Sequence, residues 1–159
     1  MNKVGIISDT HGMLRPEVAA AFAGVEMIIH AGDIGGLLVM MELKKIAPVT
    51  AVYGNTDKAE WTQEFPASAV VTVGGVQLYV LHNLATLDLD PAATGFAAVI
   101  YGHTHRQEQE TRGGVLYFNP GSAGPRRYSL PASVGVITVE DSSVRGEIIP
   151  LPDTAPVRY

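Results

Sequence analysis

The chain has 159 residues, a length typical of one domain, because chains usually divide only beyond roughly 250 residues. Hydrophobic residues make up 47% and charged residues 17% of it, the composition of a folded protein rather than a disordered one. Eleven Lys and Arg against sixteen Asp and Glu give a net charge of −5, which argues against bulk nucleic-acid binding. The chain has no cysteine, which excludes disulfides, thiolate metal sites and cysteine nucleophiles.

The sequence shows no pattern of an export signal or a membrane anchor. Its first residues lead directly into an apolar run, without the cleavable pattern of a secretory leader. The longest apolar stretches, at 37–41 and 96–101, are far shorter than the roughly 18 residues that predict a membrane span. We therefore expect a cytoplasmic protein that does not enter a membrane.

The first half of the chain alternates short apolar runs with helical segments. The apolar runs predict strands at 4–8, 27–30 and 49–53, and the segments between them predict helices at 16–23 and 37–46. Because continuous apolar strands must be covered on both faces, this alternation predicts a parallel sheet with helices packed against it.

The second half consists mainly of hairpin patterns. Three pairs of strands are predicted, each joined by a tight turn: 69–73 with 76–81, 107–111 with 115–118, and 134–139 with 144–149. A further apolar strand is predicted at 96–101, and the proline-rich tail at 150–159 is predicted to be a surface extension. Because the sequence shows no repeat and no linker, we expect residues 1–159 to form one domain of two packed sheets with helices outside.

Polar side chains that can bind metal follow the ends of the predicted strands. There are seven of them, in chain order Asp9, His11, Asp33, Asn55, His82, His103 and His105. In open α/β sheets, ligands bind outside the carboxyl ends of the strands. Residues two apart in an extended segment point the same way, so each Asp-X-His or His-X-His pair can aim two ligands at one point.

Imidazole, carboxylate and amide groups together suit Mn, Fe, Zn, Ni or Co. Seven such ligands exceed one tetrahedral site and fit two metals that share a bridge, an arrangement that can stabilise a phosphoryl group during hydrolysis. Two divalent ions, less the charges of Asp9, Asp33 and a bridging hydroxide, leave one positive charge. An acidic chain would thus present a local positive charge to a phosphate ester.

These motifs resemble those of the calcineurin-like metallophosphoesterases. The matching segments are Asp9-Thr10-His11, Gly32-Asp33, Gly54-Asn55-Thr56-Asp57, His82 and Gly102-His103-Thr104-His105. Their order and the chain length, with Asn119-Pro120-Gly121-Ser122 after them, are similar to the small bacterial and archaeal phosphodiesterases of the YfcE type. The resemblance runs from residue 4 to about 149. It implies a four-layer αββα sandwich, two mixed β-sheets flanked by helices, with the metal site at the C-terminal edge of the strands.

The resemblance also implies a role for each matching residue. One metal would take Asp9, His11 and His105, the other would take Asn55, His82 and His103, and Asp33 would bridge the two. The ions would be divalent, Mn in the typical case, with Ni, Zn, Fe or Co as alternatives, and a metal-bound hydroxide would be the nucleophile. Asp33, Asn55 and His103 are the residues expected to act in the reaction, and Asn55 is also expected to contact the substrate.

Two positions depart from the family pattern. Thr56 stands where many relatives carry a histidine that is interpreted as the proton donor to the leaving group. Threonine does not titrate near neutral pH, so we expect leaving groups that need little protonation, and modest turnover. Asn83-Leu84 follows His82, where the subfamily usually has glycine and often a second histidine.

Three further residues have two interpretations each. His30 is expected to be a buried, hydrogen-bonded histidine behind the site rather than a ligand. Asp57 either orients Asn55 or forms a turn. Arg126, next to Arg127, can reach a substrate phosphate or belong to a solvated surface pair.

The sequence therefore predicts a divalent-metal-dependent hydrolase of phosphate esters, a phosphodiesterase in preference to a phosphomonoesterase. A non-catalytic scaffold on the same fold is the alternative from another class. The expected partner is a small phosphate ester, without bulk nucleic acid or membrane. Whether the chain forms a homo-oligomer stays open.

Overall fold

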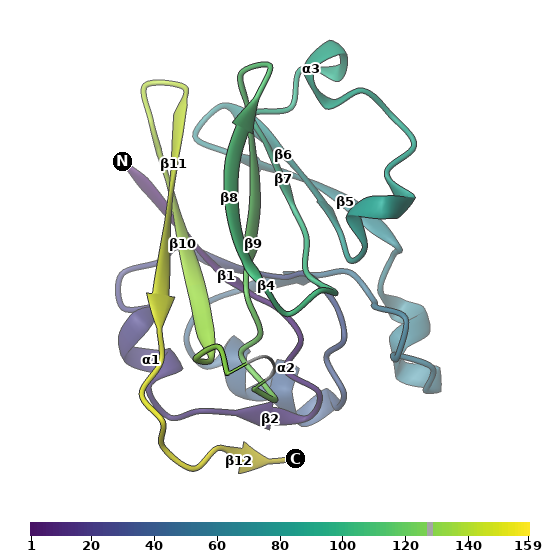
Figure 1. Ribbon diagram of the computed structural model, residues 1–159, viewed down its shortest axis with the longest axis vertical. Helices are drawn as coiled ribbons and strands as arrows, with labels where there is room; N and C mark the ends of the chain where they lie inside the picture. Colours follow the sequence, from purple (N-terminus) through teal and green to yellow (C-terminus); the bar gives the residue numbers. More distant parts are fainter. Residues whose placement is uncertain (127–128) are drawn as a thin grey trace.

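The computed structural model describes residues 1–126 and 129–159, and its framework is two five-stranded sheets (Figure 1). The first sheet has the order β11 (Ser143–Pro150), β10 (Ser133–Glu140), β1 (Asn2–Ile7), β3 (Met27–His30) and β4 (Val49–Ala51). The second has the order β5 (Ser68–Val73), β6 (Val76–Leu81), β7 (Ala98–Ile100), β9 (Val115–Pro120) and β8 (Gln107–Arg112).

Each sheet has a parallel centre and antiparallel additions. In the first sheet β1, β3 and β4 run parallel, with Ile6 beside Ile29, and the β10–β11 hairpin joins antiparallel to β1. In the second, β6, β7 and β9 run parallel between the antiparallel edge strands β5 and β8. The apolar strands are central and buried, whereas β8, with the sequence QEQETR, forms a charged edge that resists pairing with other chains.

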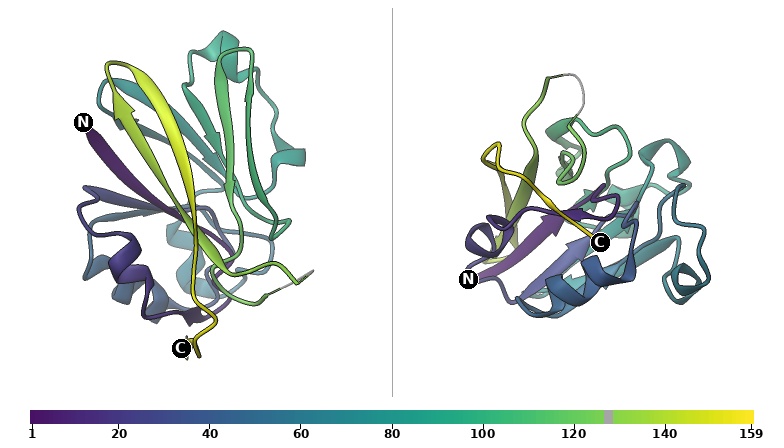
Figure 2. Two further views of the ribbon diagram at one scale, coloured as in Figure 1. Left: turned by 60° about the vertical axis from the view of Figure 1, so that its left-hand side comes forward. Right: turned by 90° about the horizontal axis from the view of Figure 1, so that it is seen from below.

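Three apolar clusters define the layers. Ile6, Val80 and Phe118 belong to the core between the two sheets. The helices α1 (Val18–Ala21) and α2 (Leu37–Lys44) lie on the outer side of the first sheet (Figure 2). A second apolar cluster, which includes Val18 and Leu43, packs there. The outer face of the second sheet packs against the segment that holds η2 (Leu84–Thr86) and α3 (Pro91–Thr94). The predicted αββα class is confirmed, with a thin fourth layer.

Several predicted element boundaries were wrong. The helix expected at 16–23 is only Val18–Ala21, and the strand expected at 96–101 is only Ala98–Ile100. A 3-10 helix, η1 (Glu60–Glu64), was not predicted. The tail is more than a surface extension, because β12 (Val157–Arg158) pairs with β2 (Met13–Leu14).

The parallel centres place the carboxyl ends of five strands at one edge. Asp9 follows β1, Asp33 follows β3, Asn55 follows β4, His82 follows β6 and His103 follows β7. Among the described residues, no helix is long and apolar enough to cross a membrane.

Candidate metal centre

Asp9, His11 and His105 form the first of two groups that could hold an ion. The Oδ1 atom of Asp9 lies 3.4 Å from Nε2 of His105 and 3.8 Å from Nε2 of His11, and the two Nε2 atoms lie 3.3 Å apart. One donor atom from each residue lies within 4.8 Å of the others. The structure therefore brings together the three residues expected at one metal.

Asp9, Asp33 and His82 form the second group. The Oδ2 atom of Asp33 lies 3.2 Å from Nε2 of His82 and 3.6 Å from Nε2 of His11. Asp33 thus faces both groups, as a bridging ligand must. Asp9 faces both as well, because its Oδ1 atom lies 3.9 Å from Nε2 of His82.

Asn55 and His103 complete the cluster at its outer side. Nδ1 of His103 lies 3.0 Å from Oδ1 of Asn55, and the His103 ring lies edge-on to the His82 ring with centroids 5.2 Å apart. Asn55 is exposed and His103 half-buried, whereas Asp9, Asp33, His82 and His105 are buried. All seven predicted residues therefore meet at one place.

The turns that carry the cluster are held in a demanding conformation. Positive φ angles occur at Asp9 (56°), His11 (47°), Asp33 (55°), His103 (75°) and His105 (62°), a region that non-glycine residues seldom adopt. Gly102 and Gly54 allow the close approach, because a Cβ at Gly102 would meet Ser8 Oγ and one at Gly54 would meet the Asp33 carboxylate. Backbone strain of this kind persists where the surroundings hold it, which is typical of functional sites.

Buried atoms of the cluster lack the hydrogen bonds that buried polar atoms normally make, and two of them face its centre. Asp9 Oδ1 and His82 Nε2 have no hydrogen-bond partner among the residues that the structure describes. His82 Nδ1 lies 2.8 Å from the Ala31 carbonyl, and in the neutral ring that donates there, Nε2 faces the two carboxylates with a lone pair that a cation can take. A cation between these groups would satisfy all of them, so the residues fit a divalent metal.

The cluster also shifts its own protonation equilibria. Burial raises the pKa of Asp33, but His82 and the Thr56 amide, which stabilise the carboxylate, outweigh burial and hold that pKa below its usual range. The pKa of Asp9 is likewise lowered, because His105, His82 and Ser8 outweigh burial. Burial lowers the pKa of His82, yet Asp33 and Asp9 bring it above its usual value. Carboxylates that stay ionised are ready ligands for a cation.

Asp57 orients the turns that carry the ligands. Its buried carboxylate accepts hydrogen bonds from the amides of Gly54 (2.9 Å), Ile34 (3.1 Å) and Gly35 (3.1 Å). It thereby joins the turn before Asn55 to the turn after Asp33. These contacts span two loops and so reach beyond a single local turn.

His30 lies behind the site, as expected. It is fully buried; Nε2 is 3.0 Å from Thr10 Oγ1, and Nδ1 accepts from the Gly32 amide at 3.1 Å. The Thr10 hydroxyl donates to the Ile34 carbonyl at 2.7 Å, so it accepts from a neutral imidazole that carries its proton on Nε2. Burial lowers the pKa of His30 to about 4.

The sequence did not predict three polar residues behind the cluster. Ser8 Oγ donates to Asp9 Oδ2 (2.8 Å), Ser122 Oγ donates to the Asp9 carbonyl (3.2 Å), and Asn119 Nδ2 donates to the Gly102 carbonyl (3.1 Å). Asn119 and Ser122 belong to the Asn-Pro-Gly-Ser segment, which was the available signal for them.

Arg126 has surroundings different from those of the seven residues. Its Nη1 atom lies 2.9 Å from Asp153 Oδ2, and its Nε donates to the Leu130 carbonyl at 3.2 Å. Among the described residues it makes no contact with the cluster; its neighbour Arg127 lies outside them.

Thr56 approaches the site with its amide, which donates to Asp33 Oδ1 at 2.9 Å. Asn83 Oδ1 accepts from the Ala85 amide and caps η2.

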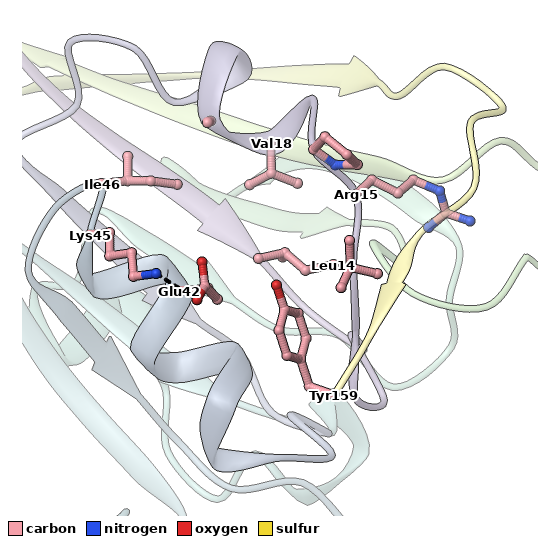
Figure 3. Close-up of a pocket in the computed structure, with 10 residues that line it drawn as sticks. Leu14, Arg15, Val18, Glu42, Lys45, Ile46 and Tyr159 are labelled. Atoms are coloured by element: carbon pink, nitrogen blue, oxygen red, sulfur yellow. Dashed lines mark hydrogen bonds and ion pairs between the residues drawn. The ribbon is translucent and has the colours of Figure 1, made fainter.

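A cavity of about 460 Å³ lies away from the cluster (Figure 3). It is mostly apolar, with Leu14, Val18, Ile46 and Tyr159 among its walls and the Glu42–Lys45 ion pair at one side. None of the seven cluster residues lines it, so the size of a cavity does not identify the candidate metal centre.

Comparison with known proteins now identifies the family. Residues 2–142 match the calcineurin-like phosphoesterase superfamily domain. The chain belongs to this superfamily. On this evidence it is a metal-dependent phosphoesterase, and the expected relationship to small phosphodiesterases of the YfcE type is confirmed.

Its relatives come from archaea and bacteria. The chain is 33% identical over 161 residues to a probable metallophosphoesterase of Methanothermobacter thermautotrophicus, covering 92% of this chain and 91% of the relative. It is 29% identical over 180 residues to the phosphodiesterase YfcE of Escherichia coli, covering 93% and 98%.

Solved structures show the same fold. A novel archaeal phosphodiesterase superposes with a TM-score of 0.75 at 27% identity, covering 92% of this chain and 99% of the other. Vps29 of Entamoeba histolytica, solved with Zn²⁺, superposes with a TM-score of 0.71 at 21% identity, covering 93% and 98%, and shows the fold alone.

Proposed function

We propose that residues 1–159 form one domain that hydrolyses small phosphodiesters with two divalent metal ions, Mn²⁺ in the first instance, in the cytoplasm. The observation that carries the proposal is the pair of donor groups that share Asp9, with Asp33 facing both. When bound, the two ions supply Lewis-acid activation of water and neutralise the charge that develops on the phosphoryl group.

In this proposal each of the two ions has its own set of ligands and the two share one bridging residue. Asp9, His11 and His105 would hold one ion, and Asn55, His82 and His103 would hold the other, with Asp33 shared. Nδ1 of His82 would be fixed by the Ala31 carbonyl, so that Nε2 points into the cluster. The ionised carboxylates would keep the ions in place, as their lowered pKa values favour.

Asn55 and His103 would meet the substrate, because they form the more exposed side of the cluster. Their hydrogen bond places an amide and an imidazole at its open side. Thr56 contributes its amide to Asp33 and brings no group that titrates near neutral pH. The proposal therefore favours diesters whose leaving group departs without a protonated side chain, and it treats Arg126 as having no part in substrate binding.

The test is hydrolysis of an aryl phosphodiester by protein that has been stripped with a chelator and resupplied with Mn²⁺. We expect no activity after stripping, recovery with Mn²⁺, and loss of activity in Asp33→Asn. A matched control is Asp141→Asn, in the exposed β10–β11 turn. Faster hydrolysis of the matching aryl monoester would overturn the diester preference. Failure of any divalent ion to bind or to restore activity would favour a non-catalytic scaffold.

A further inference from the structure

A cavity of about 120 Å³ lies apart from the metal cluster, where the C-terminal segment crosses the loop after β9. Arg15, Arg126 and Asp153 line it together with apolar residues such as Leu151, and none of the seven cluster residues does. Its volume is roughly that of four water molecules at about 30 Å³ each. The cavity is therefore large enough for one tetrahedral oxyanion.

Arg15 is a buried cation whose donors are only partly used. The residue is 5% exposed, and its Nη1 atom donates to the carbonyls of Ala123 and Gly124, both at 2.7 Å. Its Nε atom is buried and has no hydrogen-bond partner within 1–126 and 129–159. No carboxylate among the same residues lies within ion-pair distance of it. Buried arginines normally have an anionic partner, so an acceptor is missing here.

The Arg15 side chain points toward the segment that forms this cavity. In Figure 3 its guanidinium extends away from the larger cavity of about 460 Å³, which Leu14 and Tyr159 line, and toward the C-terminal segment, drawn in yellow. Burial lowers the pKa of Arg15 and Arg126 lowers it further, while Asp153 acts in the opposite direction. Arginine nevertheless stays protonated, so the cavity retains the positive charge.

Arg126 supplies a second guanidinium to the same cavity. It is paired with Asp153, a carboxylate whose side chain is 78% exposed and can move into solvent. Among the residues that line the cavity, two arginines against one aspartate leave a net charge of +1, and Glu17 acts on Arg15 from outside the lining. The exposed Arg126–Asp153 pair stabilises the fold little, so an incoming anion can replace it.

We propose that this cavity binds a small oxyanion, either free phosphate or the phosphate group of a monoester, between the guanidiniums of Arg15 and Arg126. Guanidinium groups recognise phosphate through paired N–H donors, and both arginines line this cavity. Asp153 competes with the anion for Arg126. The inference goes beyond the proposed hydrolysis and does not depend on it.

A bound anion would also contact, through Arg15, the loop that packs against Asp9 of the cluster. Arg15 holds the carbonyls of Ala123 and Gly124, and Gly124 packs so closely on the main chain of Asp9 and Thr10 that a Cβ there would collide with both carbonyls. The anion would thus tie the C-terminal segment to the loop that supports Asp9.

The test is a titration of the Mg²⁺-loaded protein with inorganic phosphate, followed through the arginine Nε–H signals in ¹H–¹⁵N spectra. We expect saturable shifts of the Arg15 and Arg126 signals, which chloride at equal ionic strength does not produce. Arg126→Ala should weaken phosphate binding about tenfold, the loss of a charged hydrogen bond. Asp153→Asn should strengthen it about threefold by removing the competing carboxylate.

Lys45→Ala is the matched control, because Lys45 is an exposed cation that pairs with Glu42 outside this cavity, and it should leave the affinity unchanged. A mononucleotide that shifts the Arg15 signal as phosphate does would show that the cavity admits the phosphate of a monoester, whereas a response to phosphate alone would assign it to the free ion. An Arg15 signal that does not move at saturating phosphate, or an unchanged affinity in Arg126→Ala, would overturn the proposal.

Discussion

The inner part of the cluster and its outer pair are held in different ways. Asp9, Asp33 and His82 are buried, and each shares a hydrogen bond with a main-chain group. Asn55 and His103 lie nearer the surface and pair their side chains with each other. The inner three are therefore positioned by the main chain, while the outer pair is positioned mainly by a side-chain contact that can rearrange. The residues that the main chain positions therefore include both carboxylates of the cluster, Asp9 and Asp33.

Replacing one residue of each part gives the largest expected contrast. Asp9→Asn should lower kcat/KM by at least roughly a thousandfold, because Asp9 belongs to both donor groups. Asn55→Ala should lower it about a hundredfold and leave one ion bound. Steady-state kinetics with metal analysis measures both. Equal losses of activity and metal in the two variants would break the distinction between inner part and outer pair.

Asp57 offers a smaller test, because it supports both parts through main-chain amides. Asp57→Ala leaves three amides without their acceptor, two of them buried, and should cost about 3 kcal/mol of unfolding free energy and tenfold or more in kcat/KM. Asp57→Asn is the matched variant, since its amide oxygen can replace Oδ2, which accepts from Ile34 and Gly54. Urea unfolding and kinetics should place Asp57→Asn between the wild type and Asp57→Ala; the reverse order would contradict the proposed role.

His30 gives the smallest expected effect and concerns stability alone. Its folded pKa of about 4 lies below the unfolded value of about 6.5, so at pH 5 the unfolded chain binds a proton that folded His30 does not. Stability should therefore fall as the pH drops from about 6.5 toward 4, by about 2 kcal/mol at pH 5. In His30→Gln the loss between pH 7 and pH 5 should shrink by that amount. Urea unfolding of metal-free protein at both pH values checks this, and equal losses in the two proteins would show that His30 titrates normally.

The sequence predicted which polar side chains the fold brings together, because each apolar run ends at a polar side chain whose position follows from strand direction. Met13–Leu14 and Val157–Arg158 could not be predicted as strands, since two residues carry no periodicity and their pairing depends on contacts far along the chain. The Tyr159 amide, for instance, donates to the Gly12 carbonyl beside His11. The contacts of Arg15 could not be predicted for the same reason, because hydrogen bonds to distant carbonyls leave no pattern in the sequence.

Calorimetric titration of chelator-stripped protein with Mn²⁺, followed by metal analysis after dialysis, tests the proposed metal centre most directly. The two donor groups, which have Asp9 in common, predict two ions per chain in the wild type and one in Asn55→Ala. Aryl phosphodiester hydrolysis should appear as the second site fills. Full activity with a single ion, or no binding of Mn²⁺ or any other divalent ion, would contradict the proposed two-metal centre.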